Sequence, residues 1–218
     1  MHYQFLVEDK SGTELIHQIM GKIIERFPET SYDCKPFHGI GNLPKGNSPK
    51  DIKTGHLLND LSIYLRGFNR CFQNVPAAIV VVVDNDDRDT EVFYAQLENI
   101  ANTNMITVDH VFCVAVEELE AWLLGDEAVI LAAYPNAKQQ PIKNYKQDSI
   151  CGTWEVLADA LYKGGHAKLN RNSPYYGEIG KLKCEWARNI GAYMDIHNNR
   201  SPSFNRFVTA IESRLQSA

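Results

Sequence analysis

The stretch that decides the fold is AAIVVVVDNDDRDTE, residues 77–91. An apolar run from Ala77 to Val83 leads directly into acidic residues at four positions: Asp84, Asp86, Asp87 and Asp89. An unbroken apolar run of this length is typical of a strand that is buried on both faces, as the central strands of parallel sheets are. The sequence therefore predicts a central strand whose carboxyl end carries several negative charges.

The composition is that of a globular protein with a core of its own. The chain has 218 residues, of which 44% are hydrophobic and 22% charged, which fits one large domain or one domain with an elaborated C-terminal part. No stretch approaches the roughly 18 apolar residues of a membrane span, and the N-terminus lacks the pattern of a signal peptide. We therefore expect a soluble, cytoplasmic protein without a membrane partner.

Charge and cysteine content restrict the classes of function. The net charge of −5 argues against a free-standing protein that grips nucleic acid through a broad basic face. It does not exclude a nuclease whose grip comes from metal ions or from a partner. The five cysteines are scattered and have no zinc-site spacing.

Hydrophobic periodicity predicts alternating strands and helices over the first 116 residues. The expected strands are 2–8, 30–37, 77–83 and 106–116, and the expected helices are 11–27, 49–71 and 89–102. The second of these helices would begin at Ser48-Pro49, a favourable N-cap followed by proline. This alternation predicts a parallel α/β sheet with helices on both faces.

The rest of the chain changes to a helical pattern. We expect a helix over 117–134, a polar linker over 135–149, and helices near 153–163, 177–196 and 203–216. The chain would therefore consist of an α/β domain, residues 1–125, and a helical C-terminal extension, residues 126–218, packed on it.

Acidic residues follow three of the four predicted strands. Glu8 ends the first, Asp84 and Asp86 end the third, and Glu117 and Glu120 follow the fourth. In parallel α/β sheets, ligands bind outside the carboxyl ends of the strands. Carboxylates held together repel each other unless a cation lies between them, and sites of oxygen ligands alone suit Mg²⁺ or Mn²⁺. The pattern predicts a divalent metal site; a solvated acidic loop with helix-capping aspartates is the alternative.

Two polar segments are candidates for contacts with a nucleic-acid backbone. The first is the loop 38–50, in which Lys45 is one of several lysines and which lacks the pattern of a phosphate-binding loop. The second is KGGHAKLNRN, residues 163–172, where His166 and Lys168 belong to the best basic and aromatic patch of the chain. For the second segment, a solvated loop is the alternative.

The order of the acidic motifs resembles the TOPRIM pattern. In that pattern a glutamate after an opening strand, here Glu8, precedes a buried strand that ends in D-x-D, here Asp84 and Asp86. The segments LVEDKSGTEL, VVVVDNDD, VEELEAWLLGDEAV and SPSFNRFVTAI look closer to a small bacterial family, the domain-of-unknown-function family numbered 4276. The resemblance spans most of the chain and implies a TOPRIM-like, that is Rossmann-like, α/β fold.

The resemblance extends to nucleases of the OLD (overcoming lysogenization defect) group and implies roles for individual residues. It implies divalent metal ligands at Glu8, Asp84 and Asp86, a ligand for a second metal at Glu120 with Glu117 in support, and a catalytic lysine at Lys183. Glu8 would act as ligand or general base. Lys181 is the rival of Lys183, and it stays open whether Glu14 takes part.

The function implied is a Mg²⁺- or Mn²⁺-dependent nuclease that hydrolyses the phosphodiester bonds of DNA or RNA. The chain has no nucleotide-hydrolysis motif of its own, so the resemblance implies a separate ATPase as partner, with bacterial phage defence as the setting. Two alternatives remain: a TOPRIM phosphoryl or nucleotidyl transferase, and a non-catalytic subunit for regulation or assembly. The sequence leaves a homo-oligomer open.

Overall fold

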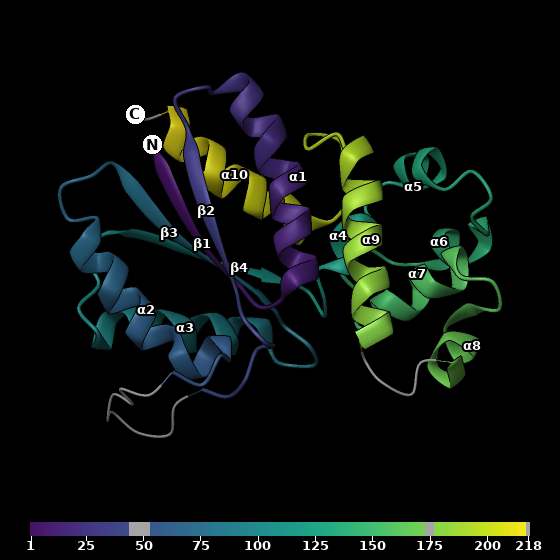
Figure 1. The fold of residues 1–218 in the computed structure, drawn as a ribbon, viewed down its shortest axis with the longest axis horizontal. Coiled ribbons are helices and arrows are strands. Elements are labelled where there is room, and N and C mark those ends of the chain that lie inside the picture. Colours follow the sequence, from purple (N-terminus) through teal and green to yellow (C-terminus); the bar gives the residue numbers. More distant parts are fainter. Residues whose placement is uncertain (44–52, 173–176, 217–218) are drawn as a thin grey trace.

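A computed structural model describes residues 1–43, 53–172 and 177–216 of the chain (Figure 1). Within these residues the sheet has four strands, all parallel, in the order β2-β1-β3-β4. The strands are β1 (His2–Val7), β2 (Ser31–Pro36), β3 (Ala77–Asp84) and β4 (Asp109–Ala115). β3 pairs with a strand on each side, and its residues from Ala77 to Val83 are all buried, which confirms the predicted central strand.

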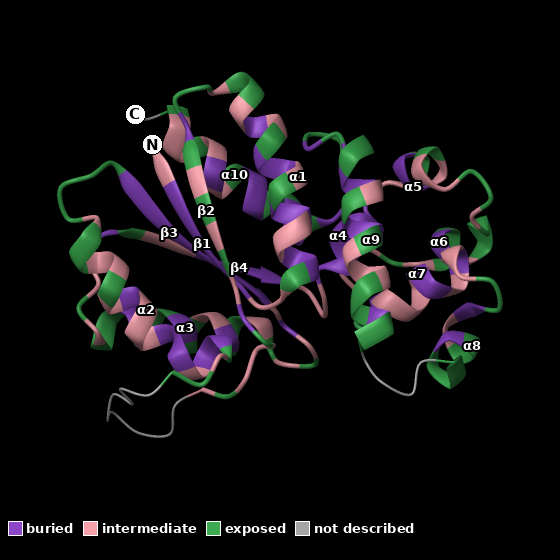
Figure 2. Cartoon of the chain, viewed as in Figure 1, coloured by how far each residue is buried: buried purple, intermediate pink, exposed green. Residues whose placement is uncertain are grey.

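Helices cover both faces of the sheet, as the alternating pattern predicted. Successive residues of a strand point to opposite faces, so Phe5 and Val80 lie in one core while Leu6 and Val81 lie in the other. The first core is covered by α1 (Lys10–Arg26), α9 (Gly177–Tyr193) and α10 (Pro202–Gln216), and the second by α2 (Leu57–Cys71) and α3 (Thr90–Thr103). Figure 2 shows β1 and β3, the two inner strands, as continuously buried, whereas residues of the edge strand β2 are exposed or half-buried. The architecture is a Rossmann-like α/β fold.

A run of shorter helices lies between β4 and α9 and forms the other half of the molecule (Figure 1). These are α4 (Glu120–Leu123), α5 (Glu127–Ala133), α6 (Gln139–Asn144), α7 (Thr153–Leu161) and α8 (Gly165–Asn172). The last helix, α10, then returns to the sheet, where the hydroxyl of Tyr3 donates to the carbonyl oxygen of Ile211 at 2.8 Å. The Trp122 ring stacks on Phe207 of α10 at 5.0 Å. The sheet and the helical half therefore share one hydrophobic core.

The second helix begins later than the sequence suggested. Residues 48 and 49, the expected start, lie outside the described part of the chain, and α2 begins only at Leu57. Before it, Gly55 has a φ of +85°, and the Asp60 carboxylate accepts the backbone N–H groups of Thr54 and Gly55 at 2.8 Å each. These contacts hold the preceding residues in a turn, so the helix starts after them.

The prediction of a single helix over 117–134 is wrong, because the helical conformation is interrupted at Gly125, between α4 and α5. The Asn199 side chain packs so closely there that a Cβ atom on Gly125 would lie 1.8 Å from its Oδ1 atom. Asp126 then caps α5 by accepting the N–H groups of Ala128 and Val129. The expected linker 135–149 likewise contains α6, and the basic segment 163–172 contains α8.

Two glycines of α1 form a matched pair for testing how tightly this helix packs. A Cβ atom at Gly12 would lie 2.6 Å from Cδ1 of Leu119 and 2.8 Å from Cγ1 of Val7, whereas one at Gly21 would meet nothing within 4 Å. We expect Gly12→Ala to lower the free energy of unfolding by about 1–3 kcal/mol through overpacking. Gly21→Ala should raise it by about 0.5–1 kcal/mol through helix propensity. Chemical denaturation measures both changes, and equal effects would contradict this packing.

Candidate metal centre

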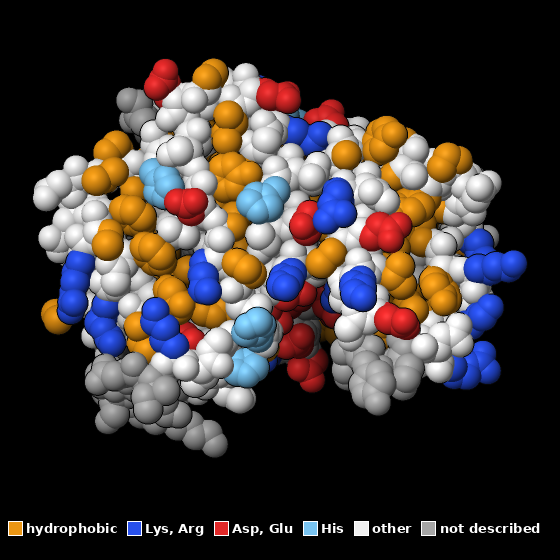
Figure 3. Space-filling view, viewed as in Figure 1, with side chains coloured by type: hydrophobic (Ala, Val, Ile, Leu, Met, Phe, Trp, Pro, Cys, Tyr) orange, Lys and Arg blue, Asp and Glu red, His pale blue; other side chains and the backbone are white. Residues whose placement is uncertain are grey.

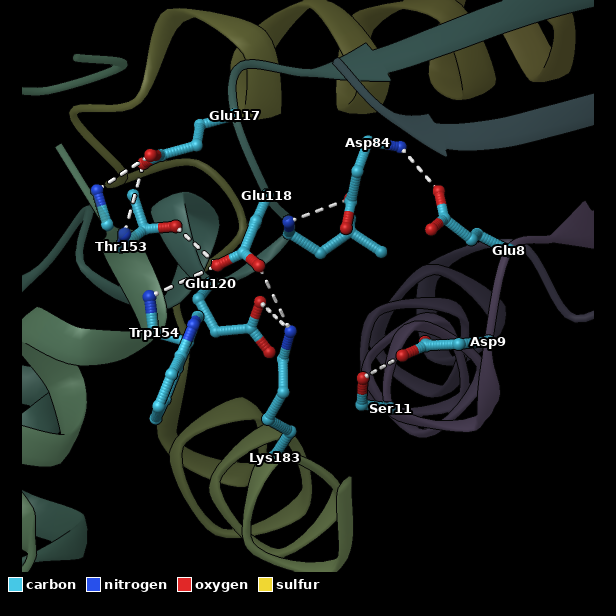
Figure 4. A network of polar contacts seen from close by, with 12 residues as sticks. Glu8, Asp9, Ser11, Asp84, Glu117, Glu118, Glu120, Thr153, Trp154 and Lys183 are labelled. Carbon is cyan, nitrogen blue, oxygen red and sulfur yellow. Dashed lines mark hydrogen bonds and ion pairs between the residues drawn. The ribbon is translucent and has the colours of Figure 1, made fainter. Parts of the chain in front are cut away.

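The carboxyl ends of β1, β3 and β4 meet at one edge of the sheet, and an acidic side chain lies at or just after each end. Glu8 follows β1, Asp84 ends β3, and Glu117 comes two residues after the end of β4. The Glu8 carboxylate accepts the backbone N–H of Asp84 at 3.1 Å, and the Asp84 carboxylate accepts the N–H of Leu119 at 2.9 Å (Figure 4). Carboxylates therefore join the three strand ends to one another.

Lys183 of α9 enters this group from the helical half of the molecule. Its Nζ atom lies 3.1 Å from Oε2 of Glu120 and 3.5 Å from Oε1 of Glu118 (Figure 4). Glu120 is only 3% exposed, and among the described residues its Oε2 atom has no hydrogen bond of good geometry. The ammonium of Lys183 is thus the charge partner of this buried oxygen rather than a well-aligned donor.

The acidic groups at this edge hold their protons unusually strongly. Burial raises the pKa of Glu8 and that of Glu120 to about 7 each. Burial also raises the pKa of Asp84 well above its usual value; the charge of Glu8 adds to this shift and Lys183 opposes it. Burial alone would lower the pKa of Lys183, but the surrounding carboxylates outweigh it, so the lysine stays charged. One lysine does not neutralise all these carboxylates, and a further cation would relieve their repulsion.

Asp86 lies at the rim of the group rather than inside it. Its backbone has a φ of +51°, in the left-handed region, and its carboxylate pairs with the guanidinium of Arg88 at 2.5 Å. Its charge still contributes to the raised pKa of Glu8. The expected D-x-D pair therefore points in two directions: Asp84 toward Leu119 and Asp86 toward Arg88.

The carboxylate of Glu117 caps a helix. It accepts the backbone N–H groups of Cys151, Gly152 and Thr153, at 3.0, 2.6 and 3.0 Å, where α7 begins. Like Asp86, Glu117 has a left-handed backbone, with a φ of +62°. The structure thus gives this side chain a structural role, while its expected support of a second metal stays a prediction.

Two further acids belong to this neighbourhood, and the sequence had assigned neither of them a role. Glu118 pairs with Lys183 and also accepts the hydroxyl of Thr153 and the N–H of Trp154. Asp9 caps α1 through the N–H of Gly12, and its charge adds to the raised pKa values of the buried carboxyls. Their positions in the sequence could have indicated a role, since Asp9 directly follows Glu8 and Glu118 directly follows Glu117.

The remaining candidates lie apart from the buried carboxylates or outside the described residues. Lys45 falls in 44–52, which the structure does not describe. His166 pairs with Asp159 at 2.9 Å, and Lys168 is exposed on α8. The lysine that reaches the carboxylates is Lys183, whereas Lys181 is exposed on the same helix and Glu14 pairs with Arg188 at 3.1 Å.

The donor chemistry of the edge fits a divalent cation. Glu8, Asp84 and Glu120 supply oxygen atoms only, which is the preference of Mg²⁺ and Mn²⁺, and the buried Oε2 of Glu120 has the ammonium of Lys183 as its charge partner among the described residues. Figure 3 shows acidic side chains gathered in a hollow in the region where Figure 1 places the carboxyl ends of the strands. In the part of the chain that is described, no three Asp, Glu, His or Cys side chains are already arranged as ligands of one ion.

The fold and these contacts define a class: a Rossmann-like α/β protein with buried carboxylates and one lysine at the carboxyl edge of its sheet. The chain matches the family described as Domain of unknown function (DUF4276) over residues 7–212, and it belongs to that family. No curated protein and no solved structure matches it significantly. None of the helices in the described ranges is long and apolar enough to span a membrane.

The raised pKa values determine how pH affects the stability of the metal-free protein. The pKa values of Glu8 and Glu120 rise from 4.5 to about 7 on folding. Between these values the folded state binds more protons than the unfolded state, so the free energy of unfolding contributed by these groups falls as pH rises. We expect the thermal midpoint in EDTA to fall from about pH 5 to about pH 8, and Mg²⁺ or Mn²⁺ to raise it again at the higher pH.

Asp84→Asn tests whether the acidic groups are coupled in this way. The substitution removes a charge that repels Glu8, so the midpoint in EDTA at about pH 8 should rise, by about 2–4 °C for each kcal/mol relieved. Its pH dependence should be flatter and its response to metal smaller. Asp87→Asn, at an exposed position nearby, should behave as wild type. A wild-type midpoint that climbs with pH over this range would contradict the coupling.

Glu117→Ala separates helix capping from metal binding. The substitution leaves three backbone N–H groups at the start of α7 without their acceptor, so we expect the free energy of unfolding to fall by about 1–3 kcal/mol. Chemical denaturation with and without Mn²⁺ checks this, and the stabilisation caused by the metal should stay the same. Unchanged stability together with loss of the metal effect would assign Glu117 to the metal instead.

Proposed function

We propose that the chain is a TOPRIM-like, metal-dependent nuclease that hydrolyses phosphodiester bonds of DNA or RNA. The observation that carries this proposal is the gathering of half-buried Glu8 and Asp84 and buried Glu120 beside Lys183, at the ligand-binding edge of a parallel sheet. Burying several like charges is unfavourable for folding and persists where function needs it. A divalent cation would pair with the carboxylates, and a phosphate group would pair with the cation and with Lys183.

The residues at this edge would share the work of hydrolysis. Mg²⁺ or Mn²⁺, held by Glu8, Asp84 and Glu120, would supply charge neutralisation and an activated water. Where Asp84 and Glu120 hold the cation and Glu8 is not itself bound to it, a pKa of about 7 would suit Glu8 to accept a proton near neutral pH. Lys183 keeps its positive charge and would stabilise negative charge that develops on the phosphate.

The resemblance of the sequence to TOPRIM and OLD-type nucleases supports the same function. The order of Glu8, Asp84, Glu120 and Lys183 along the chain follows that resemblance. The sequence has no nucleotide-hydrolysis motif, so we include a separate ATPase partner in the proposal, with bacterial phage defence as its setting.

One observation favours a second function, that of a non-catalytic assembly subunit. Lys183 already pairs with Glu118 and Glu120, and Glu117 already caps α7. Acids at this edge therefore have structural roles that need no metal. Metal binding distinguishes the two functions, since an assembly subunit does not require it.

The nuclease proposal is tested with supercoiled plasmid and with single-stranded RNA, each incubated with the protein and Mg²⁺ or Mn²⁺. We expect cleavage that depends on metal and that Asp84→Asn abolishes. Lys183→Met should lower the rate about 100-fold or more, because it removes a charge that stabilises the transition state. Lys181→Met, two residues away and exposed, is the matched control and should cleave as wild type.

Failure of this experiment is informative when metal binding is measured on the same proteins. Equal rates for Lys183→Met and wild type would remove Lys183 from the mechanism. No cleavage and no binding of Mn²⁺ by the wild type would overturn the nuclease proposal and favour the assembly subunit. No cleavage with intact, Asp84-dependent Mn²⁺ binding would call for the same assay with the ATPase partner added.

A further inference from the structure

A row of aromatic side chains runs along α2. Tyr64, Phe68 and Phe72 are four residues apart, so they lie on one side of the helix, and all three are only partly buried. Neighbouring ring centroids are 6.2 and 5.6 Å apart, with interplanar angles of 27° and 9°. Phe37, which is itself buried, continues the row at 5.1 Å from Tyr64, and His2, which is half-buried, continues it at 5.4 Å from Phe72. We call these five residues the aromatic row.

Positive charges lie directly over this row. The Nζ atom of Lys53 is 4.5 Å from the centroid of the Tyr64 ring, and that of Lys35 is 5.8 Å from the centroid of Phe37. Both lysines are exposed, so their ammonium groups can reach a ligand in solvent. Figure 3 shows Lys and Arg side chains interleaved with hydrophobic ones on the side of the molecule where Figure 1 places α2 and β2.

The aromatic row runs along the direction of β1 and β2 and ends beside the candidate metal centre. His2 lies where β1 begins, and Phe37 follows the end of β2. The backbone N–H of Phe37 donates to the carbonyl oxygen of Val7 at 2.9 Å, and the N–H of Gly39 donates to that of Glu8 at 3.0 Å. One end of the row is therefore attached to the strand end that carries Glu8. The exposed acid Asp33 lies 3.9 Å from His2, at the opposite end of the row.

We propose that the aromatic row binds a single-stranded segment of nucleic acid and leads it to the carboxylates at the edge of the sheet. The inference rests on the proposed nuclease function and names the class of substrate. Partly exposed rings offer surfaces on which unpaired bases stack, and lysines above them attract the phosphates. Bases of a duplex are already paired and stacked, so they do not reach the rings.

The charge of the chain agrees with this local mode of binding. A net charge of −5 disfavours a broad electrostatic grip on duplex DNA. Stacking on a few rings, assisted by two lysines, does not need a broad basic face. The alternative is that these aromatic side chains serve only to cover the sheet. That structural role requires neither lysines over the rings nor rings that stay partly exposed.

The test measures binding of a fluorescent 20-nucleotide oligothymidylate to the full chain by anisotropy, in EDTA, so that no cleavage takes place. Phe68→Leu with Phe72→Leu keeps apolar packing but removes two ring surfaces, and we expect affinity to fall about tenfold or more. Tyr193→Leu, which removes an exposed ring on α9, is the matched control and should bind as wild type. Lys53→Gln should reduce the slope of log K against log salt by about 0.7.

Thermal unfolding of each variant shows that a loss of affinity does not come from loss of the fold. Binding by wild type that the Phe68 and Phe72 double variant retains in full would overturn the inference, as would no binding of oligothymidylate, or equal affinity for its duplex with oligoadenylate. Row-dependent binding together with neither metal-dependent cleavage nor binding of Mn²⁺ would contradict the nuclease function and leave the binding surface in place.

Discussion

The buried ion pair between Lys183 and Glu120 is the interaction on which the arrangement of the carboxyl edge depends. It joins α9, far along the chain, to the short helix that follows β4. Without Lys183, Glu120 would be a buried carboxylate with no charge partner beside two half-buried acids, Glu8 and Asp84, and an uncompensated buried charge is strongly destabilising. The position of α9 against α1 and the sheet therefore depends on electrostatics at this edge as well as on the apolar core.

The helical half of the molecule also holds acids in place. Glu117 and Glu118 reach across to the start of α7, and together they accept backbone N–H groups from Cys151 to Trp154. The hydrogen bonds fix the loop between β4 and α4, so that Glu120 enters the buried group from a defined direction. A rigid scaffold around unfavourable charges is what a binding site requires, because the ligand then meets a field that is already organised. Repulsion among the carboxylates at the carboxyl edge of the sheet thus lowers the stability of the fold.

Much of the fold and part of the site could be predicted, because their signals are local. The apolar run to Val83 identified the central strand, and strand ends in a parallel sheet meet at one edge whatever the order of the strands. Glu8 and Asp84 were therefore accessible to sequence reasoning. Lys183 came from a resemblance to known motifs, since no local pattern distinguishes it from Lys181. The break at Gly125 was missed because its cause, Asn199, lies far away in the sequence.

The sequence by itself determined the alternation of strands and helices, the central strand and the acids at the strand ends, since each of these follows from periodicity and position within a short window. Only the tertiary structure decided what each acid does. A left-handed backbone turns Asp86 toward Arg88, and the start of α7, more than thirty residues along the chain, takes up the carboxylate of Glu117. The aromatic row likewise is completed only by tertiary packing, which brings Phe37, the residue after β2, against Tyr64 of α2. Contacts between distant segments depend on packing in three dimensions, which no local pattern encodes.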